Sequence, residues 1–161
     1  MSASAAASRE LADRTVVVTR AFDAPARLVF EAMSKPEHVM KWFGPVGWPL
    51  TLCEMDFRVG GRFRFAMTGS SGVQNTPFGG TYHEIVPNRR IVYDNGFEIP
   101  GAGRMVVTID LDEQDGRTTL TMSTLFGTVE MCREHVGMGF NQGVNSGYDQ
   151  LADLLATMTR G

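Results

Sequence analysis

The chain has 161 residues, of which 43% are hydrophobic and 20% are charged, and its formal net charge is −3. This composition is typical of a globular protein with a hydrophobic core, and it excludes the fibrous, low-complexity and disordered classes. Because the small negative charge offers no field that attracts phosphate groups, nucleic acid is not expected as a partner.

The first residues, MSASAAASRE, lack the basic and apolar regions of a secretory signal peptide. No apolar stretch reaches the ~20 residues that span a bilayer, so membrane insertion is not expected. Two cysteines, Cys53 and Cys132, are too few for a disulfide framework and are typical of a reducing compartment. We therefore expect a flexible N-terminal tail over residues 1–14, a single domain over residues 15–159, and a cytoplasmic protein.

The first predicted elements are a strand and two short helices. A β-branched run at residues 15–22 predicts the strand, and helix-start signals predict helices at about 25–33 and 36–43. The segment WFGPVGWP follows, with Trp42 and Trp48 as the only tryptophans of the chain. Its two prolines and two glycines predict a loop, and so much aromatic surface on a loop must pack against another part of the protein.

From residue 50 onward, short alternating segments separated by turn residues predict a run of antiparallel strands. These strands are expected at residues 50–57, 62–67, 81–86, 91–94, 105–111 and 120–126. The dipeptide Asn95-Gly96 is interpreted as the end of a strand, and Asp115-Gly116 as a tight hairpin turn.

The last segment is predicted to be a long amphipathic helix over residues 137–158, because apolar residues recur there every three or four positions. The order of elements predicts an α+β fold. A strongly bent antiparallel sheet of about seven strands wraps around the C-terminal helix, and two short helices follow the first strand.

Six segments carry a resemblance to a known family. They are FDAP (22–25), PE (36–37), WFGP (42–45), DFRVGGRF (56–63), GTYHEIVP (80–87) and GYDQL (147–151). With these segments in this order, the chain resembles the SRPBCC superfamily, and within it the branch homologous to the activator of heat-shock protein 90 ATPase. The resemblance covers about residues 15–158. It implies the helix-grip fold of START lipid-transfer domains and the birch-pollen allergen, in which the sheet and the last helix enclose an apolar cavity.

The leading function hypothesis is binding of a small apolar, aromatic or lipid-like molecule in that cavity, with the 42–49 loop over its entrance. The expected ligand-binding residues are Trp42, Phe43, Trp48, Met55, Phe63, Phe65, Met67, Tyr82, Glu84, Tyr93, Met122, Phe140, Val144 and Tyr148. The alternative for the aromatic residues is a solid core, since each buries ~150–250 Å² without any ligand.

Three glycines spaced by four, Gly139, Gly143 and Gly147, lie on the expected last helix. They would cost that helix on the order of 2–3 kcal/mol relative to alanine. Either a close approach of the helix to the sheet or open volume above the sheet would account for them, and both interpretations stay open.

The second hypothesis is an enzyme of the polyketide cyclase or aromatase type, with Glu84 and Tyr93 as the catalytic candidates. Glu84 is in phase with Tyr82 and Val86. If those two side chains face inward, burial would raise the pKa of Glu84 toward general acid or base duty. The opposite phase would place Glu84 in solvent beside His83.

No cofactor and no metal are expected. Cys132 and His135 have a spacing seen in metal sites, but the chain offers no second ligand pair. No nucleophile elbow, zinc-protease motif or phosphate-binding loop occurs, so hydrolase and nucleotide chemistry are not indicated. The third hypothesis, implied by the resemblance, is stimulation of a chaperone ATPase through surface contacts, and a homodimer stays open as a further partner.

Overall fold

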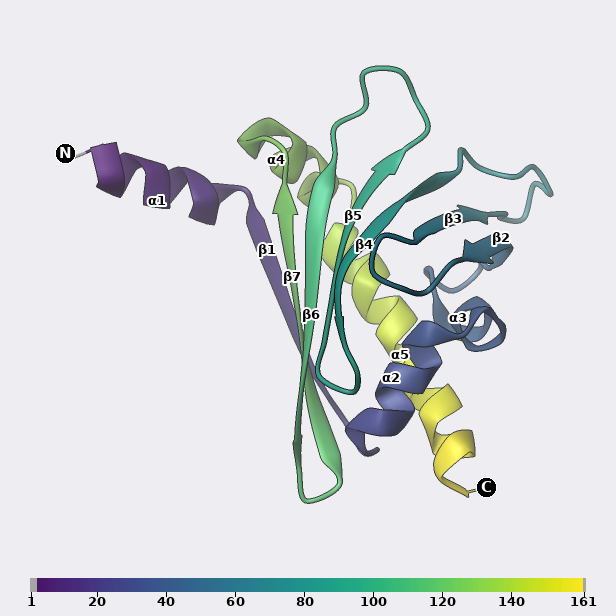
Figure 1. Ribbon diagram of the computed structural model, residues 1–161. Helices are drawn as coiled ribbons and strands as arrows, with labels where there is room; N and C mark the ends of the chain where they lie inside the picture. The colour runs from purple at the N-terminus through teal and green to yellow at the C-terminus, as the bar shows by residue number, and fades with distance from the viewer. Residues whose placement is uncertain (1–2, 161) are drawn as a thin grey trace.

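The computed structural model describes residues 3–160, which form an antiparallel sheet with helices on its inner side and at its ends (Figure 1). In chain order, the elements are α1 (Ala3–Asp13), β1 (Thr15–Phe22), α2 (Ala26–Ser34), α3 (Pro36–Trp42), β2 (Leu50–Met55), β3 (Arg62–Met67), β4 (Phe78–Val86), β5 (Arg90–Phe97), β6 (Met105–Gln114), β7 (Arg117–Phe126), α4 (Val129–Gly137) and α5 (Phe140–Arg160).

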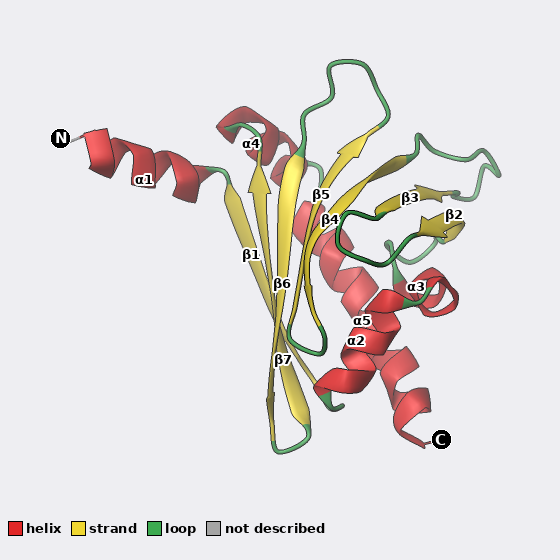
Figure 2. Cartoon of the chain, viewed as in Figure 1, coloured by secondary structure: helices red, strands yellow, loops and turns green. Residues whose placement is uncertain are grey.

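The seven strands pair in the order β1-β7-β6-β5-β4-β3-β2, and each neighbouring pair is antiparallel. Figure 2 shows the sheet bending from the long β1, β7 and β6 strands toward the short β2 and β3 strands, with α5 lying in the bend. Asp115 and Gly116 both have positive φ and form the β6–β7 turn, as their sequence predicts. The α+β helix-grip prediction is therefore confirmed.

Helix α5 packs on the sheet through one apolar face, which includes the buried residues Tyr148, Leu151 and Leu155. Helices α2 and α3 pack against α5 and contribute Val29 and Trp42 to the same core. Fully burying such side chains contributes roughly 1.5–3 kcal/mol each. This packing fixes α5 above the sheet and so positions the site described below.

The predicted long C-terminal helix is confirmed as α5, although it begins at Phe140 rather than at residue 137, because the chain turns at Gly139, whose φ is +93°. Helix α4 was not expected. It begins after Thr128, whose Oγ1 accepts a hydrogen bond from the Met131 amide at 3.0 Å.

The N-terminal segment also differs in conformation from its prediction. Residues 3–13 of the expected tail form helix α1, which has no buried residue, while Met1 and Ser2 lie outside the described residues. The flexibility of this segment stays a prediction. Across residues 3–160, no helix combines the length and the apolar character needed to cross a membrane.

Candidate functional site

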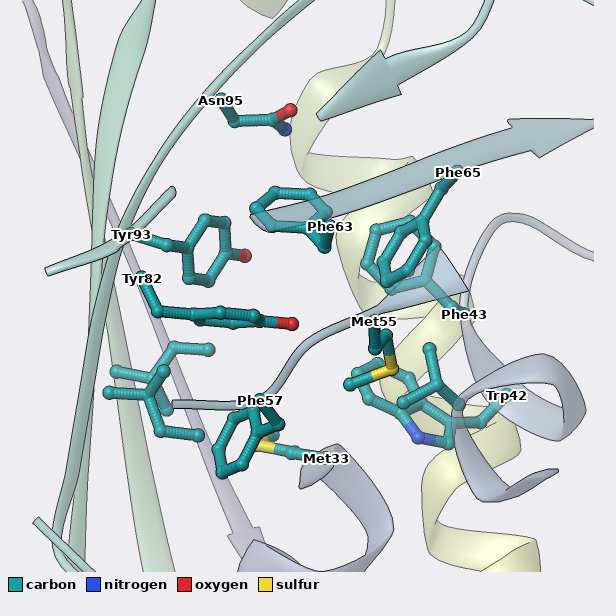
Figure 3. A pocket seen from close by; sticks show the side chains of 13 residues that line it. Met33, Trp42, Phe43, Met55, Phe57, Phe63, Phe65, Tyr82, Tyr93 and Asn95 are labelled. Atoms are coloured by element: carbon teal, nitrogen blue, oxygen red, sulfur yellow. The ribbon is translucent and has the colours of Figure 1, made fainter. Parts of the chain in front are cut away.

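A cavity of about 390 Å³ lies between the inner face of the sheet, the first half of α5 and the loop that follows α3. A smaller space of about 50 Å³ adjoins it on the side of β2, β3 and β4. The two spaces share Trp42, Phe43, Tyr93, Asn95 and Ile109 in their walls. Figure 3 shows the smaller space, where side chains from opposite sides of the fold converge.

The floor of the larger cavity is formed by the inward-facing rows of two neighbouring strands. Tyr93 and Asn95 of β5 pair with Val107 and Met105 of β6, so their side chains lie next to each other on one face. The row on β5 continues to Phe97 at the strand end. Strand alternation thus brings apolar side chains, together with one amide, under helix α5.

Helix α5 lies above the cavity, and its two glycines, Gly143 and Gly147, have different neighbours. A Cβ atom built on Gly147 would lie 3.4 Å from the Trp42 carbonyl oxygen and 3.6 Å from the Gly44 amide nitrogen. At Gly143, a Cβ would meet only Pro45 Cγ, at 3.6 Å, and Gly143 lines the cavity. Gly147 thus packs in ordinary van der Waals contact against the end of α3 and its loop rather than against the sheet, whereas Gly143 faces open volume.

The wall between the two spaces is made by Trp42 and Phe43. Trp42 is 7% exposed, its Nε1 donates to the Ala32 carbonyl oxygen at 2.9 Å, and its ring stacks on Tyr148 with centroids 5.9 Å apart. Phe43 contacts Phe65 edge-on, at a centroid distance of 5.3 Å. These contacts hold both rings in fixed positions on the cavity side of the loop.

The prediction that Trp48 covers the entrance is wrong. Trp48 is 40% exposed and lines neither space. Its ring instead covers Gly69 in the β3–β4 loop, where an added Cβ would lie 2.7 Å from the indole. The physical reason is the turn at Gly44 and Gly47, both with positive φ, which carries the end of the loop away from α5 toward β3.

Of the two orientations left open for Glu84, the structure shows the one in solvent, so Glu84 does not lie at the site where it was expected. Tyr82 pairs with Tyr93, but the next pair is Glu84 with Val92, so β4 holds one extra residue, His83. Such a bulge reverses the alternation beyond it. The Glu84 side chain is 50% exposed and forms an ion pair with Arg90 at 3.3 Å.

The cavity opens to solvent between the α4–α5 corner and the loop after β5. Met138 at that corner is 77% exposed and Phe97 is 42% exposed, and both line the cavity. This opening gives the cavity a route for exchange of its contents.

Polar groups inside the cavity are few. Asn95 Oδ1 is buried and has no hydrogen-bond partner among the described residues. Burial raises the pKa of the Tyr82, Tyr93 and Tyr148 hydroxyls, so all three stay neutral. The Tyr148 hydroxyl lies 3.2 Å from Met122 Sδ, a weak acceptor.

Several charged side chains lie on the outer face of the sheet. There, Arg64 pairs with Glu98 at 2.6 Å, and Arg104 pairs with Asp94. Burial of Asp94 opposes its ionisation, but hydrogen bonds from Arg104 and His83 outweigh this and hold the pKa of Asp94 below its ordinary value. These charged groups pair with one another, as is common on a sheet face that is exposed to solvent.

The structure brings together twelve of the fourteen residues expected at the site, all except Trp48 and Glu84. The twelve are Trp42, Phe43, Met55, Phe63, Phe65, Met67, Tyr82, Tyr93, Met122, Phe140, Val144 and Tyr148. Further lining residues were not expected from the sequence: Met33, Val39, Pro45, Phe57, Phe78, Ile91, Asn95, Phe97, Met105, Val107, Ile109, His135 and Met138. Of the two catalytic candidates, only Tyr93 faces the cavity.

No metal centre is indicated. In the part of the chain that the structure describes, no three His, Cys, Asp or Glu side chains gather closely enough to hold a metal ion. The Nδ1 atom of His135 contacts the Met131 carbonyl oxygen at 2.9 Å, and Cys132 is buried as a free thiol. Burial raises the pKa of the Cys53 thiol to about 11, so this cysteine is not a reactive thiolate.

Comparison with known proteins identifies a family. The model of the family described as "Activator of Hsp90 ATPase homolog 1-like protein" matches residues 23–156. No curated protein matches the chain.

Several solved structures are similar over nearly the whole chain. Protein CV1439 from Chromobacterium violaceum is 30% identical, with a TM-score of 0.76 over 88% of this chain and 96% of that one. Protein NE0264 from Nitrosomonas europaea is 25% identical, with a TM-score of 0.82 over 93% of this chain and 99% of that one. A protein from Arthrobacter aurescens, at 23% identity and a TM-score of 0.83, covers 92% of this chain and 89% of its own, and shares the fold.

Proposed function

Because the chain belongs to the family of activator of Hsp90 ATPase homolog 1-like proteins, and so has the helix-grip fold, we propose that it binds a small apolar or aromatic molecule between the sheet and α5. The family match and the similar structures confirm the resemblance to the SRPBCC superfamily. The observation that carries the proposal is the cavity of about 390 Å³ with an apolar lining and an open mouth.

The size of the cavity supports this function over a purely structural role. Ligand sites typically have volumes of about 300–1,000 Å³ and are lined by apolar side chains with a few polar groups. Because the cavity opens to solvent, water would fill it in the absence of a ligand, and its lining offers that water few hydrogen-bonding groups. An apolar molecule that displaces this water is therefore favoured.

An enzyme of the cyclase or aromatase type is less well supported. Its expected acid or base, Glu84, lies on the outer face of the sheet, half exposed and paired with Arg90. No Asp or Glu lines either space. A proton-transfer role would therefore fall to tyrosines that burial keeps neutral.

A role in chaperone regulation rests on the description of the family alone. No feature of the described residues favours it over binding in the cavity. A pull-down with the host chaperone, followed by an ATPase assay, distinguishes the two: stimulation by this protein would favour the regulatory role.

The proposal is tested by equilibrium dialysis against two-ring aromatic compounds, with 2-methoxynaphthalene as the first probe and decanol as the acyclic comparison. We expect one molecule of the aromatic probe per chain and weaker binding of decanol. Absence of binding by both compounds, at protein concentrations that detect millimolar affinities, would contradict the proposal.

A further inference from the structure

The two edges of the sheet differ in how well they are protected against pairing with another strand. The edge strands are β1 and β2. A free edge presents unpaired backbone N–H and C=O groups, and proteins protect it with short strands, proline, bulges or charged side chains. β2 has this protection, because it is only six residues long, follows Pro49 and has an irregular register between Leu50 and Leu52. It also carries the charged residue Glu54.

β1 lacks this protection along residues 15–22. Its eight residues, TVVVTRAF, include no proline and no lysine, and they pair with β7 without a register shift. The one charged residue, Arg20, presents no free charge to an approaching strand, because its Nη2 pairs with Asp149 of α5 at 2.9 Å. Figure 1 shows α1 leaving the sheet at the start of β1, and α1 contacts α4 there.

Alternate residues of β1 direct their backbone groups toward the free edge. The Phe126 amide donates to the Arg14 carbonyl oxygen at 2.8 Å, which fixes the pattern of hydrogen bonds between β7 and β1. Since hydrogen-bonded and non-hydrogen-bonded pairs alternate in an antiparallel sheet, the even-numbered residues of β1 bond to β7. The odd-numbered residues direct their N–H and C=O groups away from β7. These residues are Thr15, Val17, Thr19 and Ala21.

The outer face beside this edge is uncharged. Val17 is 56% exposed there, and Thr19 and Ala21 are exposed as well. Their neighbours on β7 are Ser123, Thr121 and Thr119. Two chains that each carry a formal net charge of −3 repel each other overall, so they approach most easily through a face without charges. This face meets that condition.

The edge of β1 is complementary to itself. In an antiparallel pair of two β1 strands centred on Val18, Val17 of each copy lies opposite Thr19 of the other. Thr15 of each copy lies opposite Ala21 of the other in the same register. All these residues direct their backbone groups toward the facing strand, so about eight backbone hydrogen bonds form.

The side chains fit the same register. Arg20 of each copy lies opposite Val16 of the other, so no like charges face each other across the strand pair. Valine and threonine, which make up most of the strand, are among the residues best suited to a sheet. A second copy is favoured over an unrelated extended peptide, because it supplies a strand that matches this edge in length, β-branched side chains and charge.

We propose that two copies of the chain associate through the free edges of β1, as an antiparallel strand pair with a two-fold axis at Val18. Such an interface uses the same surface on both copies and joins the two sheets into one. It is independent of the cavity and of the proposed ligand binding. Because a strand pair is smaller than the standard interface of about 1,200–2,000 Å², we expect a dissociation constant of about 1–100 μM.

The first test measures the molar mass of the protein against its concentration by sedimentation equilibrium. We expect the mass of one chain, 17.7 kDa, well below the dissociation constant, at about 0.1 μM, and a mass approaching twice that value at about 500 μM. A mass of one chain at every concentration up to about 500 μM would overturn the proposal.

Amide hydrogen exchange, followed by nuclear magnetic resonance, tests which surface forms the contact. In dilute protein the amides of Val17, Thr19 and Ala21 should exchange rapidly, and in concentrated protein they should be protected. The amides of Val16 and Val18 should be protected in both, since they bond to β7. A dimer in which the first three amides still exchange rapidly would overturn the β1 interface. Protection that appears in a monomeric chain only after addition of the synthetic peptide TVVVTRAF would assign the edge to a peptide, and it would also overturn the proposal.

Val17→Lys tests the interface by substitution, with Val106→Lys as the matched control. Both residues are exposed on the outer face, but Val106 lies in β6, which has a strand on either side. Because an edge lysine opposes strand pairing, Val17→Lys should weaken the association at least about tenfold, and Val106→Lys should leave it unchanged. Equal association by the two variants would contradict the proposal. Both variants should bind 2-methoxynaphthalene as the unmodified protein does, so failure of this inference leaves the proposed function standing.

Discussion

Replacing Gly143 with leucine should make the protein more stable and at the same time unable to bind its ligand. Gly143 lies in α5, lines the cavity, and has only Pro45 Cγ near the position of a Cβ atom. A larger side chain at this position therefore grows into the open volume. Most variants that lose binding lose stability too, so the opposite signs of the two effects make this variant informative.

The expected magnitudes follow from helix propensity and burial. Gly143→Ala should stabilise the protein by up to about 1 kcal/mol, because glycine is that much less favourable than alanine within a helix. Gly143→Leu should add about 1.5–3 kcal/mol if the rest of the side chain is buried in the cavity. Since the leucine occupies space that the ligand needs, affinity for 2-methoxynaphthalene should fall at least about 100-fold, equivalent to about 2.8 kcal/mol.

Urea unfolding followed by circular dichroism measures the stability of each variant, and equilibrium dialysis measures its affinity. Gly137→Leu is the matched control, because a Cβ at Gly137 meets nothing within 4 Å and the residue does not line the cavity. The control should bind as the unmodified protein does. Unchanged binding by Gly143→Leu would refute ligand binding in this cavity, and destabilisation by several kcal/mol would refute the open volume beside Pro45.

Three further predictions concern the cavity walls and the N-terminal segment. Burial raises the pKa of all three tyrosines. The free energy of unfolding should therefore keep their full contribution below the ordinary tyrosine pKa of about 10 and fall as the pH rises above it. The expected slope is about 1.4 kcal/mol per pH unit for each tyrosine. Phenolate absorbance should rise only together with loss of the circular dichroism signal, whereas titration near pH 10 in the folded state would speak against buried hydroxyls. Trp42→Ala should lower the free energy of unfolding in urea by about 3–5 kcal/mol, because Trp42 is buried. Trp48→Ala should lower it clearly less, because that ring is 40% exposed. Equal losses would contradict the different environments of the two rings. Deletion of residues 2–13 should change stability by less than about 0.5 kcal/mol, since α1 has no buried residue, and a larger loss would disprove our proposal that residues 15–159 fold as one domain.

The sequence could predict the fold because its signals are local and repeated. Strand alternation, the Asp115-Gly116 turn and the spacing of apolar residues in α5 each indicate one element, and together they indicate a bent sheet around a helix. The aromatic residues of β3 and α5 could be assigned to the interior for the same reason. Whether that interior is solid or hollow depends on how closely α5 approaches the sheet, which alternation does not determine.

The incorrect predictions arise from single residues that override a local rule. His83 is an extra residue in β4, and it reverses the side on which Glu84 lies. Asn95-Gly96 is a common turn signal, but here β5 continues through it to Phe97, because both residues pair within the sheet. For this reason Asn95 was not recognised as a site residue. Trp48 lies only six residues beyond Trp42, yet the glycine turns between them place the two rings in different environments.

The most direct test of the proposed function is a crystal structure of the protein grown with 2-methoxynaphthalene. We expect electron density for one planar molecule between the sheet and α5, beside Trp42 and Tyr148. Density for the compound only on the outer surface, with the rings of Phe43 and Phe140 closed over the cavity, would contradict it.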